Sequence, residues 1–584
     1  GFTGTPIFEN NSTYKQIDGT ISSYRTTKDV FQQELHAYTI TNAIDDGNVL
    51  RFHIDYFKPD DVKKAAKAAS TISKKAVVEA ILAKHDSATY NRRYNAIFAT
   101  SRINEAIEYF ELFKELQEER KKKDSSFKPL NLACVFSPPA EGNKDVKQLQ
   151  EDLVQEKIDN EQEPDKKKEA LKKIIKDYND AYRTNHSVNE FDLYYQDVQK
   201  RIKDQQYSNA DYPHENKIDI AIVVDMLLTG FDSKYLNTLY VDKNLKYHGL
   251  IQAFSRTNRI LNPTKPYGNI IDFRGHEDEV NDAIKLFSGK ENSEKVKEIW
   301  LVDPAPIVVE KLEKAVLALE KFMESQGLEC KPEKVSNLKG DIARAGFIDK
   351  FKEVQRLKTQ LDQYTDIKKE QATKIDELLP EDTLRAFRGV YIETAQQLKA
   401  QQGKDLDHKV PEIEQLDFEF VLFSSAIVDY DYIMSLISKY TQPDVPKKEK
   451  MTKKELIDLI FSTSNLMEER KDIEEYIETL EAGKGLDEKA IRTGYQKFKE
   501  EKFVKVVVKI ASVHGLEPSD LQSFVDEIIG RMIFDGERLS DLLEPLDLGW
   551  RDRTKKELEI MGDLIPLLKK LASGREIVGL KAYE

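Results

Sequence analysis

The sequence has few cysteines and no long apolar run. Its two cysteines, Cys134 and Cys330, lie far apart in a chain of 584 residues. This spacing excludes a disulfide framework and indicates a reducing compartment. No CxxC or HxxxH spacing accompanies them, so we expect no bound metal. No stretch of about 18 uncharged apolar residues is present, so we expect no transmembrane helix and no membrane partner. These absences favour a cytoplasmic protein.

The composition is that of a large soluble protein with several cores. Apolar residues make up 40% and charged residues 33% of the chain, both ordinary values. The formal net charge of −14 excludes a protein that coats nucleic acid by bulk charge. Residues 215–274 nevertheless carry more basic than acidic side chains, which allows a local basic groove. The start, Gly1 to Pro6, resembles no signal peptide and lacks an initiator Met, so we expect a fragment or a processed product.

The first 275 residues predict an α/β domain. Continuous apolar runs suit strands that are buried on both faces of a parallel sheet. Helical patterns, such as the one at 102–118, separate these runs, and this alternation predicts a doubly wound parallel sheet. The runs lie at 96–100, 132–136, 218–224, 239–241 and 269–273.

Residues 141–169 depart from this pattern. They are rich in acidic and basic residues and contain almost no large apolar ones. Such a composition favours a solvated insertion or a mobile segment within the α/β domain.

The second half of the chain predicts packed helices. Asp303 and Pro306 can start a helix whose apolar residues follow at helical spacing, and Gly327 can end it. Thr452 and Glu455 form a capping-box pattern before further apolar residues. Other amphipathic helices are predicted at 382–401, 520–529 and 555–571.

Chemically informative residues begin after the run at 218–224, with Thr229-Gly230-Phe231-Asp232. In doubly wound sheets, ligands bind where the strands end. Gly230 would permit a tight turn and close backbone approach at such an end. Asp232 could accept a hydrogen bond from a ribose hydroxyl or hold the turn.

A predicted helix follows with Gln252, Arg256 and Arg259. The two arginines are three residues apart and would project from one helix face, which Gln252 shares. Paired guanidinium groups match a triphosphate and can stabilise charge on a γ-phosphoryl group. An Arg-x-x-Arg pair by itself usually marks a salt-bridged surface, and Gly-x-Asp an ordinary turn. The ordered combination favours a nucleotide site. His248 could touch the nucleotide or make a structural hydrogen bond.

These stretches resemble the motifs of superfamily 2 helicases. Residues 229–232 resemble motif V, and 252–259 resemble motif VI, which carries the arginine finger. Residues 3–6 resemble motif III, and 97–102 resemble motif IV at the first strand of the second RecA-like domain. The amino-acid sequences of residues 1–8 and 239–260 are similar to those of the restriction (R) subunit of type I restriction–modification enzymes. Residues 427–433 match this family more weakly.

The resemblance implies part of an ATP-dependent subunit that translocates and cleaves DNA. Its catalytic residues would be Arg256 and Arg259. The nucleotide would be bound by both arginines together with Gly230, Asp232 and Gln252. Phosphates of double-stranded DNA would be contacted by Thr3, Thr5, Thr100, Ser101 and Thr229. Such contacts position DNA without reading its sequence. ATP and Mg²⁺ would serve the intact subunit, and its partners would be the methyltransferase (M) and specificity (S) subunits.

One feature of the family is missing from the sequence. The chain contains no Gly-x-x-x-x-Gly-Lys-Ser/Thr phosphate loop, and none of its Asp-Glu pairs directly ends a predicted strand as a metal-holding Asp-Glu-x-x box would. We therefore expect this chain alone to bind no ATP tightly and to be inactive. Another superfamily 2 DNA translocase and a helical assembly module without activity remain alternatives.

The implied organisation has four parts. A remnant of the first RecA-like domain and a linker would occupy 1–35, and the second RecA-like domain 36–295. A helical domain would span 296–445, and a C-terminal helical region 446–584.

Overall fold

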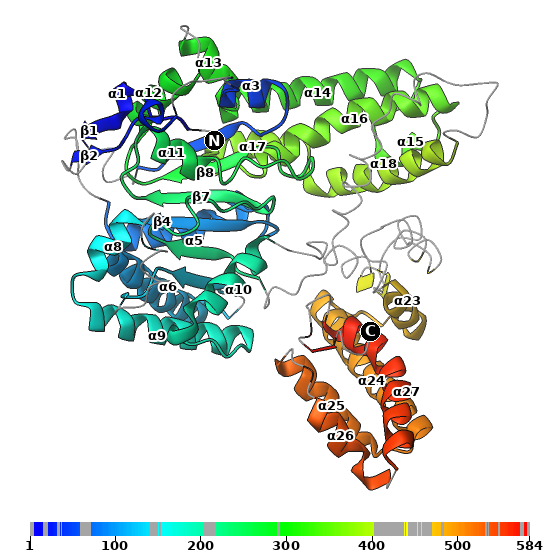
Figure 1. The fold of residues 1–584 in the computed structure, drawn as a ribbon. Helices are drawn as coiled ribbons and strands as arrows, with labels where there is room; N and C mark the ends of the chain where they lie inside the picture. Colours follow the sequence, from blue (N-terminus) through cyan, green and yellow to red (C-terminus); the bar gives the residue numbers. More distant parts are fainter. Residues whose placement is uncertain are drawn as a thin grey trace. The chain divides into compact units, whose positions relative to one another are not determined.

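The computed structural model describes most of the chain (Figure 1). The described residues are 5–15, 21–31, 36, 38–58, 72–125, 127–140, 150, 153–203, 217–288, 293–401, 437–438, 440–441, 453, 457, 470–480, 484–531, 534, 536–546, 549–572, 577 and 579–580. The chain divides into two compact units. Unit 1 comprises Gly1–Ala181, His186–Gln205 and His214–Phe423, and unit 2 comprises Tyr182–Asn185, Gln206–Pro213 and Ser424–Glu584.

A six-stranded parallel sheet forms the centre of unit 1 (Figure 1). Its strands are β3 (Phe52–Tyr56), β4 (Asn95–Thr100), β5 (Leu132–Val135), β6 (Ile220–Val223), β7 (Leu236–Asp242) and β8 (Gly268–Asp272). Their order is β3-β8-β7-β4-β6-β5, and every neighbouring pair is parallel. All residues of β4, β6, β7 and β8 are buried, as in a sheet covered on both faces. The predicted doubly wound fold and its five strands are confirmed.

Strand β3 is the one strand of this sheet that the apolar pattern does not predict. Its sequence, Phe-His-Ile-Asp-Tyr, alternates polar and apolar residues, yet His53 and Asp55 are only 5% and 6% exposed. His53 Nδ1 lies 2.9 Å from Asn269 Oδ1, and Asp55 accepts a hydrogen bond of 2.5 Å from Lys84 Nζ. Partners from distant segments therefore allow these polar side chains to be buried.

Helices surround the sheet in unit 1 (Figure 1). The longest, α6, packs against β4, β5 and β6, and its core residues follow the predicted helical pattern at 102–118. The helices along the sheet are α5 (Lys74–Ala88), α6 (Ile103–Lys123), α8 (Val154–Asn160), α9 (Pro164–Tyr182), α10 (Phe191–Lys203), α11 (Tyr247–Phe254), α12 (Glu277–Phe287) and α13 (Ser293–Trp300). Residues near the start of the chain form α1 (Glu9–Ser12), α2 (Thr27–Val30), α3 (Ile40–Asp45) and the hairpin of β1 (Thr13–Lys15) and β2 (Ile21–Ser23).

Most of the described residues in 141–169 are exposed, as the predicted solvated insertion requires, but they also include α8, the start of α9 and several buried charged side chains. Glu156 is fully buried, and its carboxylate accepts hydrogen bonds from the backbone N–H groups of Ser137 (2.6 Å), Asp225 (2.9 Å) and Met226 (3.1 Å). Burial and the charge of Asp225 raise the pKa of Glu156. Charged side chains are buried here because backbone donors at strand ends bind them.

A bundle of long helices completes unit 1. Helix α14 (Ala305–Ser325) carries Pro306 in its first turn, and Gly327 follows its end with φ +71°, as predicted. Helix α16 (Asp341–Leu361) packs against α14 and against α18 (Glu381–Gln401), and Figure 1 shows these helices side by side. A Cβ atom on Gly346 would lie 2.7 Å from the Phe322 ring, so this glycine allows α14 and α16 to approach closely. Two shorter helices, α15 (Pro332–Val335) and α17 (Lys369–Leu378), complete the bundle.

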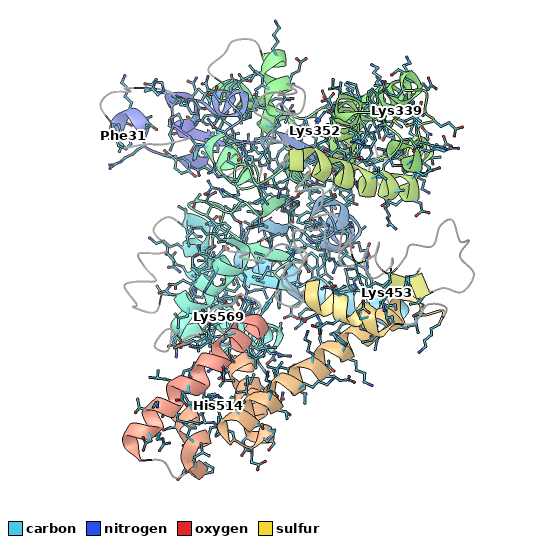
Figure 2. The ribbon with its side chains drawn as sticks, turned by 90° about the vertical axis from the view of Figure 1, so that its right-hand side faces the viewer. Phe31, Lys339, Lys352, Lys453, His514 and Lys569 are labelled. Atoms are coloured by element: carbon cyan, nitrogen blue, oxygen red, sulfur yellow. The ribbon has the colours of Figure 1, made fainter. Side chains whose placement is uncertain are left out.

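Unit 2 is helical. The helices of eight residues or more among its described residues are α23 (Arg470–Thr479), α24 (Glu488–His514), α25 (Pro518–Arg531), α26 (Gly536–Leu543) and α27 (Trp550–Ala572). Buried residues of α24, α25, α26 and α27 form one apolar core, and Figure 2 labels His514 of α24 and Lys569 of α27. The helices predicted at 520–529 and 555–571 are confirmed. The capping box of Thr452 and Glu455, and the match at 427–433, lie outside the described residues. Among the described helices, none has the length and hydropathy that a membrane span needs.

Candidate nucleotide and DNA contact sites

The two candidate arginines lie in a loop, so their predicted placement on one helix face is wrong. Helix α11 ends at Phe254, and Ser255 is its C-cap. The hydroxyl of Thr257 then donates a hydrogen bond of 2.8 Å to the Phe254 carbonyl, which occupies an acceptor at the helix end. We call residues 255–265 the arginine loop.

Both arginines nevertheless meet the Thr229-Gly230-Phe231-Asp232 turn. Arg256 donates through Nη1 to the Phe231 carbonyl and through Nε to the Gln252 carbonyl at 3.0 Å. Burial lowers the pKa of Arg256, as does the charge of Arg259, while Asp232 opposes the shift. Arg259 Nε lies 2.7 Å from Asp232 Oδ1, with side chains 37% and 61% exposed. The tertiary fold thus places two guanidinium groups beside one solvent-accessible turn.

This site lies near the amino ends of two strands, so its expected position at the carboxyl ends is also wrong. Lys265, the last residue of the arginine loop, donates to the carbonyl of Leu236, the first residue of β7. Gly268, the first residue of β8, lies against Thr257. The turn itself is exposed at Thr229 and Gly230, and Gly230 has φ +70°, a conformation that favours glycine.

Gln252 connects the site to the start of the chain. Its side-chain Nε2 donates a hydrogen bond of 2.8 Å to the hydroxyl of Thr5. Residues that resemble motifs III and VI are therefore in direct contact. Thr3 lies outside the described residues.

Thr100 and Ser101 lie at the opposite, carboxyl end of the sheet. Thr100 is fully buried and donates a hydrogen bond of 3.0 Å to the Val223 carbonyl. Its side chain has no surface with which to contact DNA, so we withdraw it from the predicted DNA-contact set. Ser101 is partly exposed and donates to the Asp242 carbonyl at 3.0 Å.

An ion pair beside Ser101 was not predicted. Arg274 Nε lies 2.6 Å from Asp242 Oδ1, and the Arg274 Nη2 atom donates to the Ser101 hydroxyl at 3.3 Å. Burial raises the pKa of Asp242, although Arg274 and the Tyr109 hydroxyl act in the opposite direction. Asp242 ends β7, and Arg274 follows β8, its neighbour in the sheet. The sequence does not show that β7 and β8 are neighbours in the sheet, so it could not predict this ion pair.

His248 belongs to the packed interior of unit 1. It lies in α11, is 8% exposed, and contacts Tyr24 edge-on with ring centroids 4.7 Å apart. Burial lowers its pKa. In the part of the chain that the structure describes, no group of three His, Cys, Asp or Glu residues is arranged to hold a metal ion.

The fold agrees with one class of protein, which the family models then decide. A doubly wound parallel sheet, together with helical bodies, is the architecture of the second RecA-like domain of a helicase-type motor with C-terminal helical domains. Three family models match in succession: SWI2/SNF2 ATPase at residues 1–91, type I restriction enzyme subunit R domain 3 at 92–275, and type I restriction and modification enzyme subunit R C terminal at 300–571. The chain belongs to the family of type I restriction enzyme R subunits.

Curated relatives agree with this assignment. The endonuclease subunit of a type I restriction enzyme from Staphylococcus aureus strain COL is 31% identical over 477 residues, which cover 76% of this chain and 44% of the relative. The corresponding subunit from Staphylococcus saprophyticus is 29% identical over 464 residues, covering 77% and 45%. The chain therefore spans less than half the length of these relatives. A solved fragment assigned to an HsdR subunit from Vibrio vulnificus YJ016 matches with a TM-score of 0.27 at 14% identity, too low to compare the folds.

Proposed function

We propose that the chain is part of the ATP-dependent DNA-translocating and DNA-cleaving subunit of a type I restriction enzyme, with Arg256 and Arg259 as its arginine fingers. The observation that carries this proposal is the convergence of both guanidinium groups on the turn at Phe231 and Asp232. Arg259 fits a phosphate contact because only its Nε atom is engaged by Asp232 in a direct ion pair, and its side chain is 37% exposed. A guanidinium group in this position would stabilise charge that develops on the γ-phosphoryl group.

The rest of the proposed nucleotide contact follows from the same turn. Gly230 and Asp232 would border the nucleotide, and Gln252 would hold the start of the chain through Thr5. ATP supplies the phosphoryl group that is transferred to water when it is bound in the intact subunit. The described residues offer no cluster of ligands for Mg²⁺, so we assign no Mg²⁺ ligand to them.

We further propose that Thr5 and Thr229, near the arginine loop, and Ser101, at the opposite end of the sheet, contact phosphates of double-stranded DNA at separate positions. The helical bundle of unit 1 and unit 2 would dock onto the methyltransferase and specificity subunits or guide the duplex. We also propose that the protein acts in the cytoplasm. Because the sequence has no phosphate loop, the chain alone would not hydrolyse ATP. The predicted divisions at residues 35, 295 and 445 stay part of this proposal.

The arginine assignment is tested by Arg259→Ala in the intact subunit. We expect DNA-stimulated ATPase activity to fall by about 1,000-fold or more, the range known for arginine fingers, while assembly with the other subunits is unchanged. Arg385→Ala is the matched control, because Arg385 also forms an exposed ion pair, with Glu381 at 3.2 Å on α18. Turnover at the wild-type rate in Arg259→Ala would remove Arg259 from the nucleotide site.

A further inference from the structure

A buried lysine holds the arginine loop in place. Lys265 is 1% exposed. Its ammonium group donates three hydrogen bonds to backbone carbonyls, at 2.8 Å to Arg259, 2.9 Å to Lys234 and 2.9 Å to Leu236. An ammonium group has three N–H donors, so all of them are used. Three separate points of the backbone are therefore joined through a single side chain.

The charge of Lys265 is costly where it lies. Its acceptors are neutral carbonyls, and burial, together with the nearby charge of Arg259, lowers the pKa of Lys265 well below its usual value, with Asp232 opposing. An apolar side chain of similar volume would avoid this desolvation cost. In return, the three hydrogen bonds of the ammonium group fix the backbone of the arginine loop, which forms no helix or strand.

The bonds of Lys265 act on the candidate catalytic residue directly. Arg259 is held on two sides: Lys265 binds its carbonyl oxygen, and Asp232 binds its guanidinium group. The Lys234 and Leu236 carbonyls belong to the segment that continues from Asp232 into β7. Lys265 therefore fixes the distance between the backbone that carries Arg259 and the backbone that carries its carboxylate partner.

Neighbouring contacts anchor the lysine itself. The Thr264 carbonyl accepts a hydrogen bond of 2.9 Å from Gln363 Nε2. The Thr264 hydroxyl lies 2.5 Å from the Tyr94 hydroxyl. These residues come from the loop after α16 and from the approach to β4. The end of the arginine loop is thus fixed to the domain body, so that Lys265 can restrain the rest of the loop.

We propose that Lys265 is a positioning residue that sets the reach of Arg259 towards the nucleotide, an inference that rests on the function proposed above. Lys265 touches no reacting atom in this assignment. It acts through the Arg259 backbone. Its loss should therefore lower the maximal ATPase rate without weakening the binding of ATP or DNA.

The experiment uses the full-length subunit with Lys265→Met, which keeps the length of the side chain and removes the charge and the donors. Lys217→Met is the matched control. Lys217 is 4% exposed and also donates to backbone carbonyls, those of Arg92 (3.0 Å) and Arg93 (3.3 Å), but none of these belongs to the arginine loop. Both variants should be compared at a temperature at which thermal unfolding shows both to be folded.

We expect kcat for DNA-stimulated ATPase to fall by about 100-fold in Lys265→Met, the scale of a misplacement of about 1 Å, with KM for ATP and the affinity for DNA within twofold of wild type. Lys217→Met should keep kcat within twofold. Equal losses of kcat in the two variants, or a change in KM alone, would overturn the positioning role. If Lys265→Met does not fold, Lys265→Gln replaces it, because its amide keeps two donors. A folded Lys265→Gln subunit with wild-type kcat would also overturn the role.

The outcomes separate the two proposals. Loss of activity in Arg259→Ala with wild-type activity in Lys265→Met would refute only the positioning role. Wild-type activity in Arg259→Ala would refute the proposed function, whatever Lys265→Met does.

Discussion

Gly268→Ala should destabilise unit 1 by displacing the arginine loop. An ideal Cβ atom on Gly268 would lie 2.3 Å from the Thr257 hydroxyl oxygen and 3.1 Å from both the Cβ and the carbonyl carbon of Thr257. The backbone carbon cannot move aside as a flexible side chain can. Overpacking of this kind costs about 1–3 kcal/mol, and we expect a value in the upper half of that range. Thr257 lies between the two candidate arginines, so the same change should also reduce activity.

Gly249→Ala is the matched control for this prediction. Gly249 lies within α11, and a Cβ atom there would meet no atom within 4 Å. Alanine in a helix interior is favoured over glycine by up to about 1 kcal/mol. The same substitution should therefore stabilise unit 1 at position 249 and destabilise it at position 268.

The assay is urea unfolding followed by tryptophan fluorescence. The chain has two tryptophans, so a Trp550→Phe background leaves Trp300, which is 1% exposed in unit 1, as the reporter. Thr257→Ala removes the closest contact of the new methyl group and leaves the contacts at 3.1 Å. The double variant should therefore recover part of the loss, with a coupling free energy of about 1 kcal/mol or more. A Gly268→Ala chain as stable as wild type would refute the geometry of the arginine loop.

Two further predictions concern ionisable groups. Burial would raise the pKa of Asp197, but the hydrogen bond from His186, the charge of Arg201 and the hydrogen bond from Tyr178 together lower it to about 2 from 3.8. The ionised carboxylate therefore stabilises α10 above about pH 4 by about 2 kcal/mol, and this contribution should be lost as the pH falls towards 2. Hydrogen exchange in α10, corrected for intrinsic rates, should show the loss in wild type and not in Asp197→Asn, and equal pH dependence in both chains would contradict it. Burial raises the pKa of the Cys134 thiol far above its usual value and that of Cys330 to about 11. At pH 8 a thiol reagent should modify the half-buried Cys330 slowly and Cys134 only in urea, as mass spectrometry can show, and modification of Cys134 first would be inconsistent with its burial.

Local sequence patterns were sufficient to predict the elements whose burial is continuous along the chain. Apolar runs predicted β4 to β8, because a strand covered on both faces needs no polar residue. Helical spacing, with Pro306 near the start and Gly327 at the end, predicted α14. The amino-acid sequence at 239–260 indicated the family, and the two family models of type I R subunits, at 92–275 and 300–571, confirm it.

Only the tertiary structure decided how distant polar groups are paired. Strand β3 and the buried Glu156 were missed because their acceptors and donors come from segments far away in the sequence. The position of the arginines at the amino ends of β7 and β8 depends on their contacts with Phe231 and Asp232. It also depends on the hydrogen bond of 2.8 Å from the Leu50 N–H to the carbonyl of Asn258 in the arginine loop. The sequence alone would predict that Lys265 is an ordinary surface lysine, because only the structure shows its three carbonyl partners. Periodicity reports which face of an element is buried, whereas hydrogen bonds and ion pairs between segments depend on their arrangement in space.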